Sequence, residues 1–261
     1  MVVVLSWLRR TTKHTQDIVA KINLPRTEDG HLKTLQHIRA VTLDVGGTLI
    51  TPWPSVGHIY AEVAARSGVA GIPSEMLDAR FRAAWRELKN FHHGREEWAA
   101  LVDKVFDGLT PQSPSETFFP DLFQRFAEPA AWKIYDDVLP AIDAIAGLGI
   151  NLGIISNWDE RLAPLLGTIG LRKYFDSVVV SCEIGFPKPS PVIFEHAARK
   201  LGVAPEFILH VGDSLREDVE GARSAGFEAL LIARGNGAPP PDAIKSLCDL
   251  EPLLGGSRHQ D

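Results

Sequence analysis

The sequence is poor in cysteine: Cys182 and Cys248 are the only two among 261 residues, and no C-x-x-C spacing occurs. This scarcity excludes a disulfide scaffold and is typical of a reducing compartment. No uninterrupted apolar run approaches the roughly 20 residues that cross a bilayer, which argues against an integral membrane protein. Positive charge is not in excess, since the net charge is -6 and the pI about 5.9. Neither nucleic acid nor an anionic membrane is therefore expected as a partner.

The first 16 residues lack acidic side chains altogether. They contain Arg9, Arg10, Lys13 and several Ser and Thr residues, a composition typical of a mitochondrial transit peptide. A short extension without a targeting role fits the same residues. We expect residues 1–38 to form an N-terminal extension and the protein to be cytoplasmic, with a mitochondrial location as the alternative.

Short apolar, β-branched runs are present from residue 40 onward. They cover residues 40–44, 151–156, 207–211 and 228–233, with a weaker run at 177–181. Helical patterns lie between the later runs and end in glycine at positions 149, 170, 202 and 226, as left-handed helix caps do. Alternation of strand and helix predicts an α/β fold, a Rossmann-like three-layer core with a mostly parallel sheet.

The stretch from residue 55 to 135 interrupts this alternation with helical patterns and no convincing strand. The expected helices cover residues 58–66, 74–91, 95–106 and 115–127, with Ser74 and Ser115 as N-caps. We expect a four-helix cap domain at 55–135, inserted into a core domain made of 39–54 and 136–235. A C-terminal tail at 236–261, rich in Pro and Gly, is expected to hold one helix.

Polar residues follow the strands where ligands bind in open α/β sheets, at the carboxyl ends. Asp44 ends the first run, Ser156 ends the second, and Lys188 follows the run at 177–181. Asp213 and Asp218 follow the run at 207–211. Each residue alone would be an ordinary turn or capping residue, whereas the whole set predicts one site.

Four segments together resemble the motifs of the haloacid dehalogenase superfamily: LDVGGT at 43–48, ISN at 155–157, GFPKPSP at 185–191 and GDSLRED at 212–218. The helical insertion resembles the type I cap of that family. The phrases SNWDERL and KPSPVIF are similar to the eukaryotic haloacid dehalogenase-like hydrolase domain-containing proteins. The resemblance implies a hydrolase that acts on a small phosphorylated molecule and uses Mg²⁺.

The resemblance also implies roles. Asp44 would be the covalent nucleophile and a metal ligand, together with the backbone carbonyl of Gly46 and the carboxylate of Asp213. Asp218 would hold the metal's water shell or orient Lys188. Four polar side chains would have further catalytic or substrate-binding roles. Thr48 would bind near the nucleophile, and Ser156, Asn157 and Lys188 would bind the phosphoryl oxygens. Such donors would stabilise charge in the transition state.

One position departs from the pattern. Phosphatases of this superfamily carry a second Asp two residues after the nucleophile, and this chain has Gly46 there. Glycine offers no proton, so general acid/base catalysis of about 10² to 10⁴-fold must come from another group or be lost. The cap offers candidate acids, namely His58, Tyr60, His92 and His93. Asp159 is expected to cap the helix that follows it.

Three functions remain open from the sequence. The first is a Mg²⁺-dependent phosphatase working through an aspartyl-phosphate on Asp44. The second is a weak or inactive relative that binds a phosphorylated ligand, which Gly46 would permit. The third is a dehalogenase, against which the retention of Lys188, Asp213 and Asp218 argues. Either a monomer or a homodimer is compatible with the sequence.

Overall fold

Six parallel strands form the centre of the computed structural model, which describes residues 35–88, 91–234, 240 and 243–255. In spatial order the strands are β5 (Ser177–Val180), β4 (Asn151–Ser156), β1 (Ala40–Leu43), β6 (Ile208–Gly212), β7 (Glu228–Ile232) and β8 (Ala243–Ile244). Each neighbouring pair is parallel. The expected α/β fold with a parallel sheet is confirmed. β8 was not predicted, because a two-residue strand leaves no periodic signal in the sequence.

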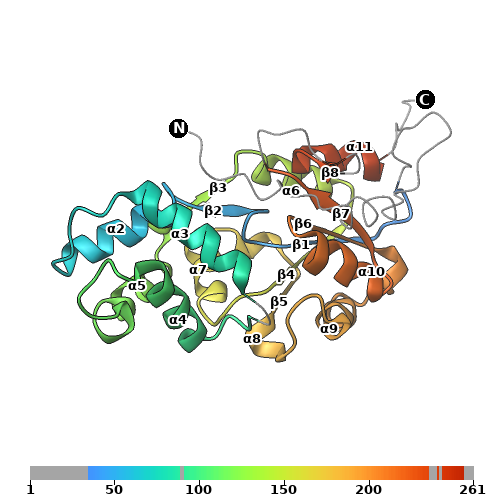
Figure 1. The fold of residues 1–261 in the computed structure, drawn as a ribbon. Coiled ribbons are helices and arrows are strands. Elements are labelled where there is room, and N and C mark those ends of the chain that lie inside the picture. The colour runs from blue at the N-terminus through green and yellow to red at the C-terminus, as the bar shows by residue number, and fades with distance from the viewer. Residues whose placement is uncertain (1–34, 89–90, 235–239, 241–242, 256–261) are drawn as a thin grey trace.

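Helices cover both faces of this sheet (Figure 1). Alternate strand residues such as Val41 and Leu43 pack with α6 (Val138–Gly147), α7 (Leu162–Thr168) and α11 (Leu250–Gly255). The opposite face packs against α9 (Pro191–Leu201) and α10 (Gly221–Ser224). Because side chains alternate along a strand, one short run supplies apolar residues to both layers. The result is the three-layer core expected from the sequence.

Glycines end the helices that return to the sheet. Gly149, Gly170, Gly202 and Gly226 have φ values of 75°, 77°, 67° and 84°, the left-handed region that favours glycine. The sequence prediction of left-handed caps at these four positions is confirmed.

The helical insertion contains α2 (Val56–Arg66), α3 (Ser74–Glu87), α4 (Arg95–Phe106) and α5 (Phe119–Arg125), gathered at one end of the molecule (Figure 1). These helices share an apolar cluster of their own, drawn from residues 56–132. A second, antiparallel sheet joins the insertion to the core through β2 (Ile50–Pro52) and β3 (Trp132–Ile134). This pair was not predicted, since strands of only three residues leave no periodic pattern.

The predicted caps inside the insertion are wrong. Ser74 is the first residue of α3, and the N-cap position belongs to Pro73. Ser115 lies within a 3₁₀ turn (Pro114–Glu116), and α5 begins only at Phe119. A proline near each start fixes φ and nucleates the turn without a serine cap. The side chain that does cap a helix here is Ser55, which accepts the N–H of His58 at 3.2 Å and starts α2.

Short helices complete the connections: α8 (Ser181–Ile184), a π-type turn (Leu215–Glu220) and 3₁₀ turns at Pro129–Ala131, Arg172–Tyr174, Pro205–Phe207 and Leu247–Asp249. In the expected tail, α11 is preceded by β8 and a 3₁₀ turn rather than standing alone. Most of the expected N-terminal extension lies outside the described residues. Within the described part of the chain, none of the helices has the length and apolarity that a membrane crossing requires.

Candidate active site

The predicted site residues lie at the carboxyl edge of the main sheet. Asp44 directly follows β1, Ser156 ends β4, and Asp213 follows β6. Lys188 comes from the loop between α8 and α9. Since β4, β1 and β6 are adjacent and parallel, their carboxyl ends meet at one place.

Lys188 is the centre of the arrangement. Its ammonium Nζ donates to Oδ1 of Asp44 at 2.7 Å and to Oδ1 of Asp218 at 2.6 Å. A third bond goes to the backbone carbonyl of Ile155 at 3.0 Å. The side chain is only 2% exposed, so a full positive charge is held away from water. An ammonium has three N–H groups, and all three are used.

Ser156 also donates to the nucleophile candidate. Its hydroxyl Oγ lies 3.0 Å from Oδ1 of Asp44, the same oxygen that Lys188 contacts. Both Asp44 and Ser156 are buried. The other carboxylate oxygen of Asp44, Oδ2, takes part in neither of these two hydrogen bonds. The geometry thus places a hydroxyl, an ammonium and a carboxylate in one contact group.

Burial and neighbouring charges shift the pKa values of Asp44, Lys188 and Asp218 in opposite directions. Burial raises the pKa of Asp44, and the Lys188 ammonium opposes that rise. Burial would lower the pKa of Lys188, but the carboxylates of Asp218 and Asp44 raise it well above its usual value. Burial would likewise raise the pKa of Asp218, yet Lys188 and His210 hold it far below its usual value. Lys188 and Asp218 are therefore a charged pair at neutral pH.

Sequence reasoning missed a buried chain of polar groups beneath Asp218. Nε2 of His210 lies 3.1 Å from Oδ1 of Asp218, and its Nδ1 lies 2.9 Å from the hydroxyl of Thr42. Burial lowers the pKa of His210, so the ring is neutral at neutral pH. A neutral ring that donates from Nε2 to the carboxylate accepts at Nδ1 from Thr42. A histidine inside an apolar strand run was the available signal, because buried polar groups need partners.

Glycines allow the loops to approach the carboxylates. A Cβ on Gly47, which has a φ of 75°, would overlap the carboxylate of Asp213. A Cβ on Gly212 would overlap the carboxylate of Asp218. Asp218 also accepts the backbone N–H of Ser214 at 2.9 Å. Glycine is thus required at both positions for this packing.

Thr48 lies on the same loop as Asp44 but makes different contacts from those expected. Its backbone carbonyl accepts from the guanidinium of Arg234, which also binds both oxygens of Asp137 at 2.7 Å. Its hydroxyl is buried and has no hydrogen-bond partner within the described residues. The arginine anchors the loop that follows Asp44. The expected hydroxyl role of Thr48 stays a prediction.

Asn157 contacts the backbone of Lys188. Its Oδ1 accepts the N–H of Lys188 at 2.7 Å, and its Nδ2 donates to the carbonyl of Lys188 at 3.0 Å and to Oε2 of Glu217 at 3.3 Å. Because both ends of the amide are engaged, the geometry favours a positioning role for Asn157. Contact with substrate, which the sequence suggested, has no support in these bonds.

Three carboxylates could hold a divalent cation. One oxygen each of Asp44, Asp213 and Asp218 lies within 4.8 Å of the other two. Asp213 is exposed while the other two are buried, so the cluster opens toward solvent on one side. Hard oxygen ligands of this kind suit Mg²⁺, so the donor set fits the expected metal. The ion pair with Lys188 matches the second of the two roles expected for Asp218.

The loop after Ser156 links the core to the helical insertion. Asp159 does not cap α7, whose N-cap position belongs to Arg161, so that prediction is wrong. Its carboxylate accepts the backbone N–H of Arg161 at 3.0 Å and the Arg161 side chain at 2.8 and 2.6 Å. The guanidinium of Arg161 also donates to the carbonyl of Phe123 in α5 at 2.6 Å and lies 3.4 Å from the centre of its ring. The Asp159 carboxylate thus holds both the backbone and the side chain of Arg161, and one guanidinium contacts both of its oxygens.

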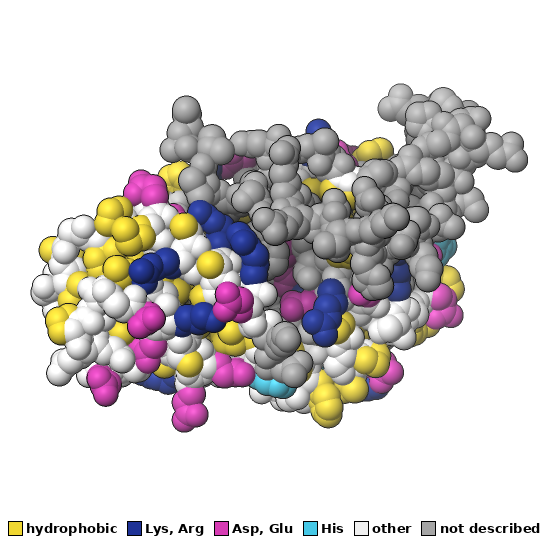
Figure 2. Space-filling view, in the orientation of Figure 1, with side chains coloured by type: hydrophobic (Ala, Val, Ile, Leu, Met, Phe, Trp, Pro, Cys, Tyr) yellow, Lys and Arg dark blue, Asp and Glu magenta, His cyan; other side chains and the backbone are white. Residues whose placement is uncertain are grey.

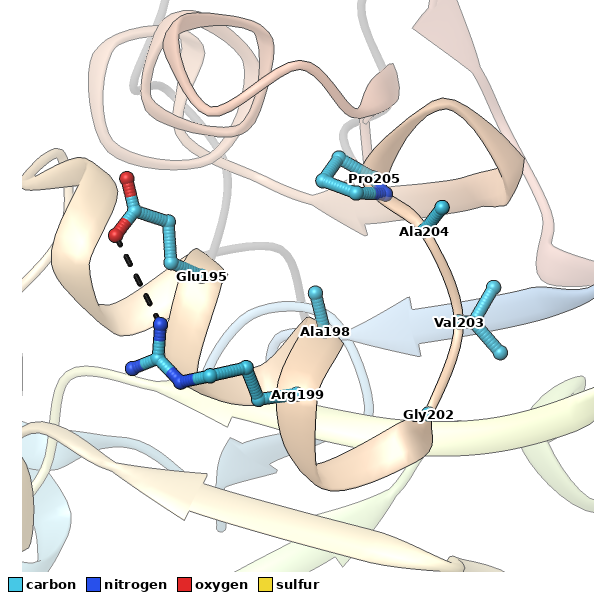
Figure 3. Close-up of a pocket in the computed structure, with 7 residues that line it drawn as sticks. All are labelled: Glu195, Ala198, Arg199, Gly202, Val203, Ala204 and Pro205. Carbon is cyan, nitrogen blue, oxygen red and sulfur yellow. Dashed lines mark ion pairs between the residues drawn. The ribbon is translucent and has the colours of Figure 1, made fainter.

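The face in Figure 2 carries basic and acidic side chains side by side, so it is not a single basic surface. A shallow hollow near the end of α9 is lined by Glu195, Ala198, Arg199, Gly202, Val203, Ala204 and Pro205 (Figure 3). The segment that lines this hollow leads into the first residue of β6. The hollow therefore lies at the opposite edge of the sheet from Asp44. Its charged side chains, Glu195 and Arg199, form an exposed pair at 4.0 Å. The hollow is therefore separate from the site.

Comparison with known proteins agrees with the fold. A family model described as haloacid dehalogenase-like hydrolase matches residues 38–226, so the chain belongs to that hydrolase family. The human haloacid dehalogenase-like hydrolase domain-containing protein 3 is 32% identical over 236 residues, which covers 83% of this chain and 94% of the relative. The glyceraldehyde 3-phosphate phosphatase of Methanopyrus kandleri is 38% identical over 215 residues, covering 76% and 85%.

Solved structures share the fold. The crystal structure of a HAD phosphatase from Thermococcus onnurineus has a TM-score of 0.61 and 26% identity, and covers 85% of this chain and all of that one. The HAD-hydrolase YfnB of Bacillus subtilis, solved bound to magnesium, has a TM-score of 0.69 and 18% identity, covering 84% and 99%. At that identity the second likeness shows the fold alone.

Proposed function

We propose that this hydrolase is a Mg²⁺-dependent phosphatase that acts on a small phosphorylated metabolite through an aspartyl-phosphate on Asp44. The observation that carries the proposal is the buried contact group in which Ser156 and Lys188 both donate to Asp44. Two similar proteins, from Methanopyrus kandleri and Thermococcus onnurineus, are named phosphatases, which favours phosphoryl transfer over other hydrolytic reactions.

The chemistry follows from the side chains. An oxygen of Asp44 forms a bond to phosphorus while the bond between phosphorus and the leaving oxygen breaks. Lys188 and Ser156 would then donate to the phosphoryl oxygens, on which charge accumulates in the transition state. Asp218 keeps Lys188 charged and oriented, and Asn157 fixes the backbone of Lys188. Water then attacks phosphorus, which releases phosphate and restores the carboxylate of Asp44.

The expected metal would be held by Asp44, Asp213, Asp218 and the backbone carbonyl of Gly46. When bound, Mg²⁺ would supply the positive charge that lets a carboxylate approach a dianionic phosphoryl group. Without a cation, Lys188 is the one positive charge in direct contact with Asp44 within the described residues. A single ammonium shared between two carboxylates leaves the cluster short of positive charge, which supports the need for a metal.

We also propose that residues 55–135 act as a cap over a core made of 39–54 and 136–235. The insertion has its own apolar cluster, and the antiparallel pair of β2 and β3 connects it to the core. Arg161 would hold the cap near the site, since it joins the loop after Ser156 to the carbonyl of Phe123.

The test is a phosphate-release assay on a panel of phosphorylated metabolites, with Mg²⁺ and with a chelator. We expect Mg²⁺-dependent turnover that falls to background in Asp44→Asn. Asp136→Asn is the matched control, because this aspartate is 91% exposed and lies outside the contact group. Equal activity of Asp44→Asn and the unaltered protein would show that Asp44 is not the nucleophile.

Gly46 favours a second candidate, a relative that binds phosphorylated ligands without turning them over. Beryllofluoride with Mg²⁺ should form a mimic of aspartyl-phosphate in either case, which shifts the unfolding temperature. An active phosphatase would also release phosphate from the panel, whereas a binding protein would not. Activity toward a haloacid that survives chelation would indicate a dehalogenase and would contradict both.

A further inference from the structure

The side chain missing at position 46 leaves space that a tryptophan partly fills. A Cβ built on Gly46 would lie 3.3 Å from Cζ3 of Trp158, a contact closer than ordinary packing. The indole of Trp158 also lies against that of Trp132, with ring centres 5.2 Å apart. An apolar ring therefore faces the backbone two residues after the nucleophile, where an acidic side chain would otherwise point.

The fold holds Trp158 in place. Its backbone N–H donates to the hydroxyl of Ser181 at 3.1 Å, and that hydroxyl lies 3.1 Å from its backbone carbonyl. The N–H of Cys182 donates to the same carbonyl at 3.3 Å. The first two residues of α8 thus fix the loop that carries the ring. The apolar wall is a built feature of the site.

The donors in contact with Asp44 cannot protonate a leaving oxygen. All three N–H groups of Lys188 are engaged, with Asp44, Asp218 and the carbonyl of Ile155. Ser156 donates to Asp44 itself. A donor whose proton is already engaged is a poor general acid.

Within the described residues none of the four candidate acids of the cap hydrogen-bonds to Asp44, whose side chain contacts Ser156 and Lys188. The ring of His58 contacts the hydroxyl of Ser55 at 2.8 Å, within the cap. Tyr60 is buried among phenylalanines of the cap cluster, and burial raises its pKa. His92 is exposed. His93 lies near the site, since the charges of Asp159 and Lys188 act on it, but burial lowers its pKa to about 4, so its ring is neutral at neutral pH.

We propose that this chain is selective for phosphoryl compounds whose leaving group is stable as an anion, such as aryl and acyl phosphates, because Gly46 and Trp158 place no proton donor beside Asp44 in the described part of the chain. The inference rests on the proposed function and narrows its substrate class. In the first step the electron pair of the breaking bond stays on the leaving oxygen, which departs unprotonated. In the second step both protons of the attacking water remain on the dihydrogen phosphate that is released.

The experiment measures kcat/KM for phenyl phosphates with substituents of graded electron withdrawal, together with acetyl phosphate and glycerol phosphate, all with Mg²⁺. We expect a steep fall in kcat/KM as the leaving group becomes more basic. The alkyl ester should be slower than the nitrophenyl ester by at least about 10²-fold, the lower range of general acid catalysis. The unaltered protein gives this result, so the test does not depend on a variant that folds.

Two matched variants locate the cause. Gly46→Asp adds a carboxyl, and Gly46→Asn adds the same volume without an acid, so both require the Trp158 ring to shift by a few tenths of an ångström. We expect the Asp variant alone to gain about 10² to 10⁴-fold on the alkyl ester and to flatten the dependence on the leaving group. The Asn variant should keep the steep dependence.

Glu217 provides the rival explanation. Its carboxyl is half-buried and contacts Nδ2 of Asn157 at 3.3 Å, on the side of the site that carries Lys188. Glycerol phosphate hydrolysed as fast as the nitrophenyl ester would overturn the proposal, and loss of that activity in Glu217→Gln would identify Glu217 as the acid. Failure to hydrolyse any compound of the series would refute the phosphatase itself. The two failures are therefore distinguishable.

Discussion

Replacing Lys188 with methionine should destabilise the core of the molecule strongly. The ammonium of Lys188 bridges Asp44 and Asp218 at 2.7 and 2.6 Å, and its side chain is 2% exposed. Methionine has a similar volume but no charge. The variant would leave two buried carboxylates without their cation, which is the costly way to break a buried ion pair.

The magnitude follows from what remains around each carboxylate. Removal of one partner from a buried pair costs about 3 to 5 kcal/mol. Asp218 would keep the N–H of Ser214 and the ring of His210, and Asp44 would keep the hydroxyl of Ser156. These remaining donors place our expectation at about 3 to 4 kcal/mol, in the lower part of that range. Urea denaturation in the presence of a chelator measures the difference.

The matched control is Lys200→Met. Nζ of Lys200 donates to the carbonyl of Val178 at 2.9 Å, without a carboxylate partner, so the same substitution should cost no more than about 1.5 kcal/mol. Mg²⁺ gives a second readout, because the carboxylate cluster without Lys188 binds a cation more tightly and Mg²⁺ should stabilise Lys188→Met more than the unaltered protein. Equal stability of Lys188→Met and the unaltered protein under chelation would refute the reasoning.

Two other contacts lead to predictions about stability. Thr42→Val should destabilise the protein by about 1 to 3 kcal/mol, because Nδ1 of His210 would lose its buried hydrogen-bond partner. Urea denaturation measures this difference. An unchanged midpoint would argue against the hydrogen-bond chain that runs from Thr42 through His210 to Asp218. Burial alone would raise the pKa of Asp137, but hydrogen bonds led by Arg234 lower it below its usual 3.8. This depressed pKa contributes stability at neutral pH that is lost as pH falls through the folded value, so the deficit of Asp137→Asn relative to the unaltered protein should shrink below pH 3.8. A deficit that stays constant in urea titrations from neutral pH to below that value would contradict the assignment.

Most of the main sheet could be predicted because β4, β5, β6 and β7 each combine an apolar run with a glycine-capped helix before it, and β1 is a continuous apolar run. Both signals are local. The antiparallel pair of β2 and β3 could not be predicted, since its two strands have three residues each and lie about 80 positions apart in the sequence. Helix boundaries in the insertion failed for a related reason: proline replaced serine as the starting signal at α3 and in the turn before α5.

The candidate site could also be predicted only in part. Strand-end residues such as Asp44 and Ser156 were visible because sheet topology alone brings them together. The contacts that hold them were not visible: Arg234 lies 186 positions from Thr48, and Arg161 lies 38 positions from Phe123. Such pairs depend on tertiary packing that no local pattern encodes. His210 was also missed, although an ionisable residue within a buried strand was a local signal that a partner is needed.

The glycines around the site differ in whether the packing of the acidic cluster requires them. At positions 47 and 212 a Cβ would overlap the carboxylates of Asp213 and Asp218, so a side chain there would displace the acidic cluster itself. At Gly46 a Cβ would meet only the edge of the Trp158 ring, and its φ lies outside the left-handed region. Glycine at 46 is therefore not required by the carboxylate cluster, and its effect falls on proton transfer. A chain can in this way keep a complete phosphoryl-binding group while changing which leaving groups it accepts.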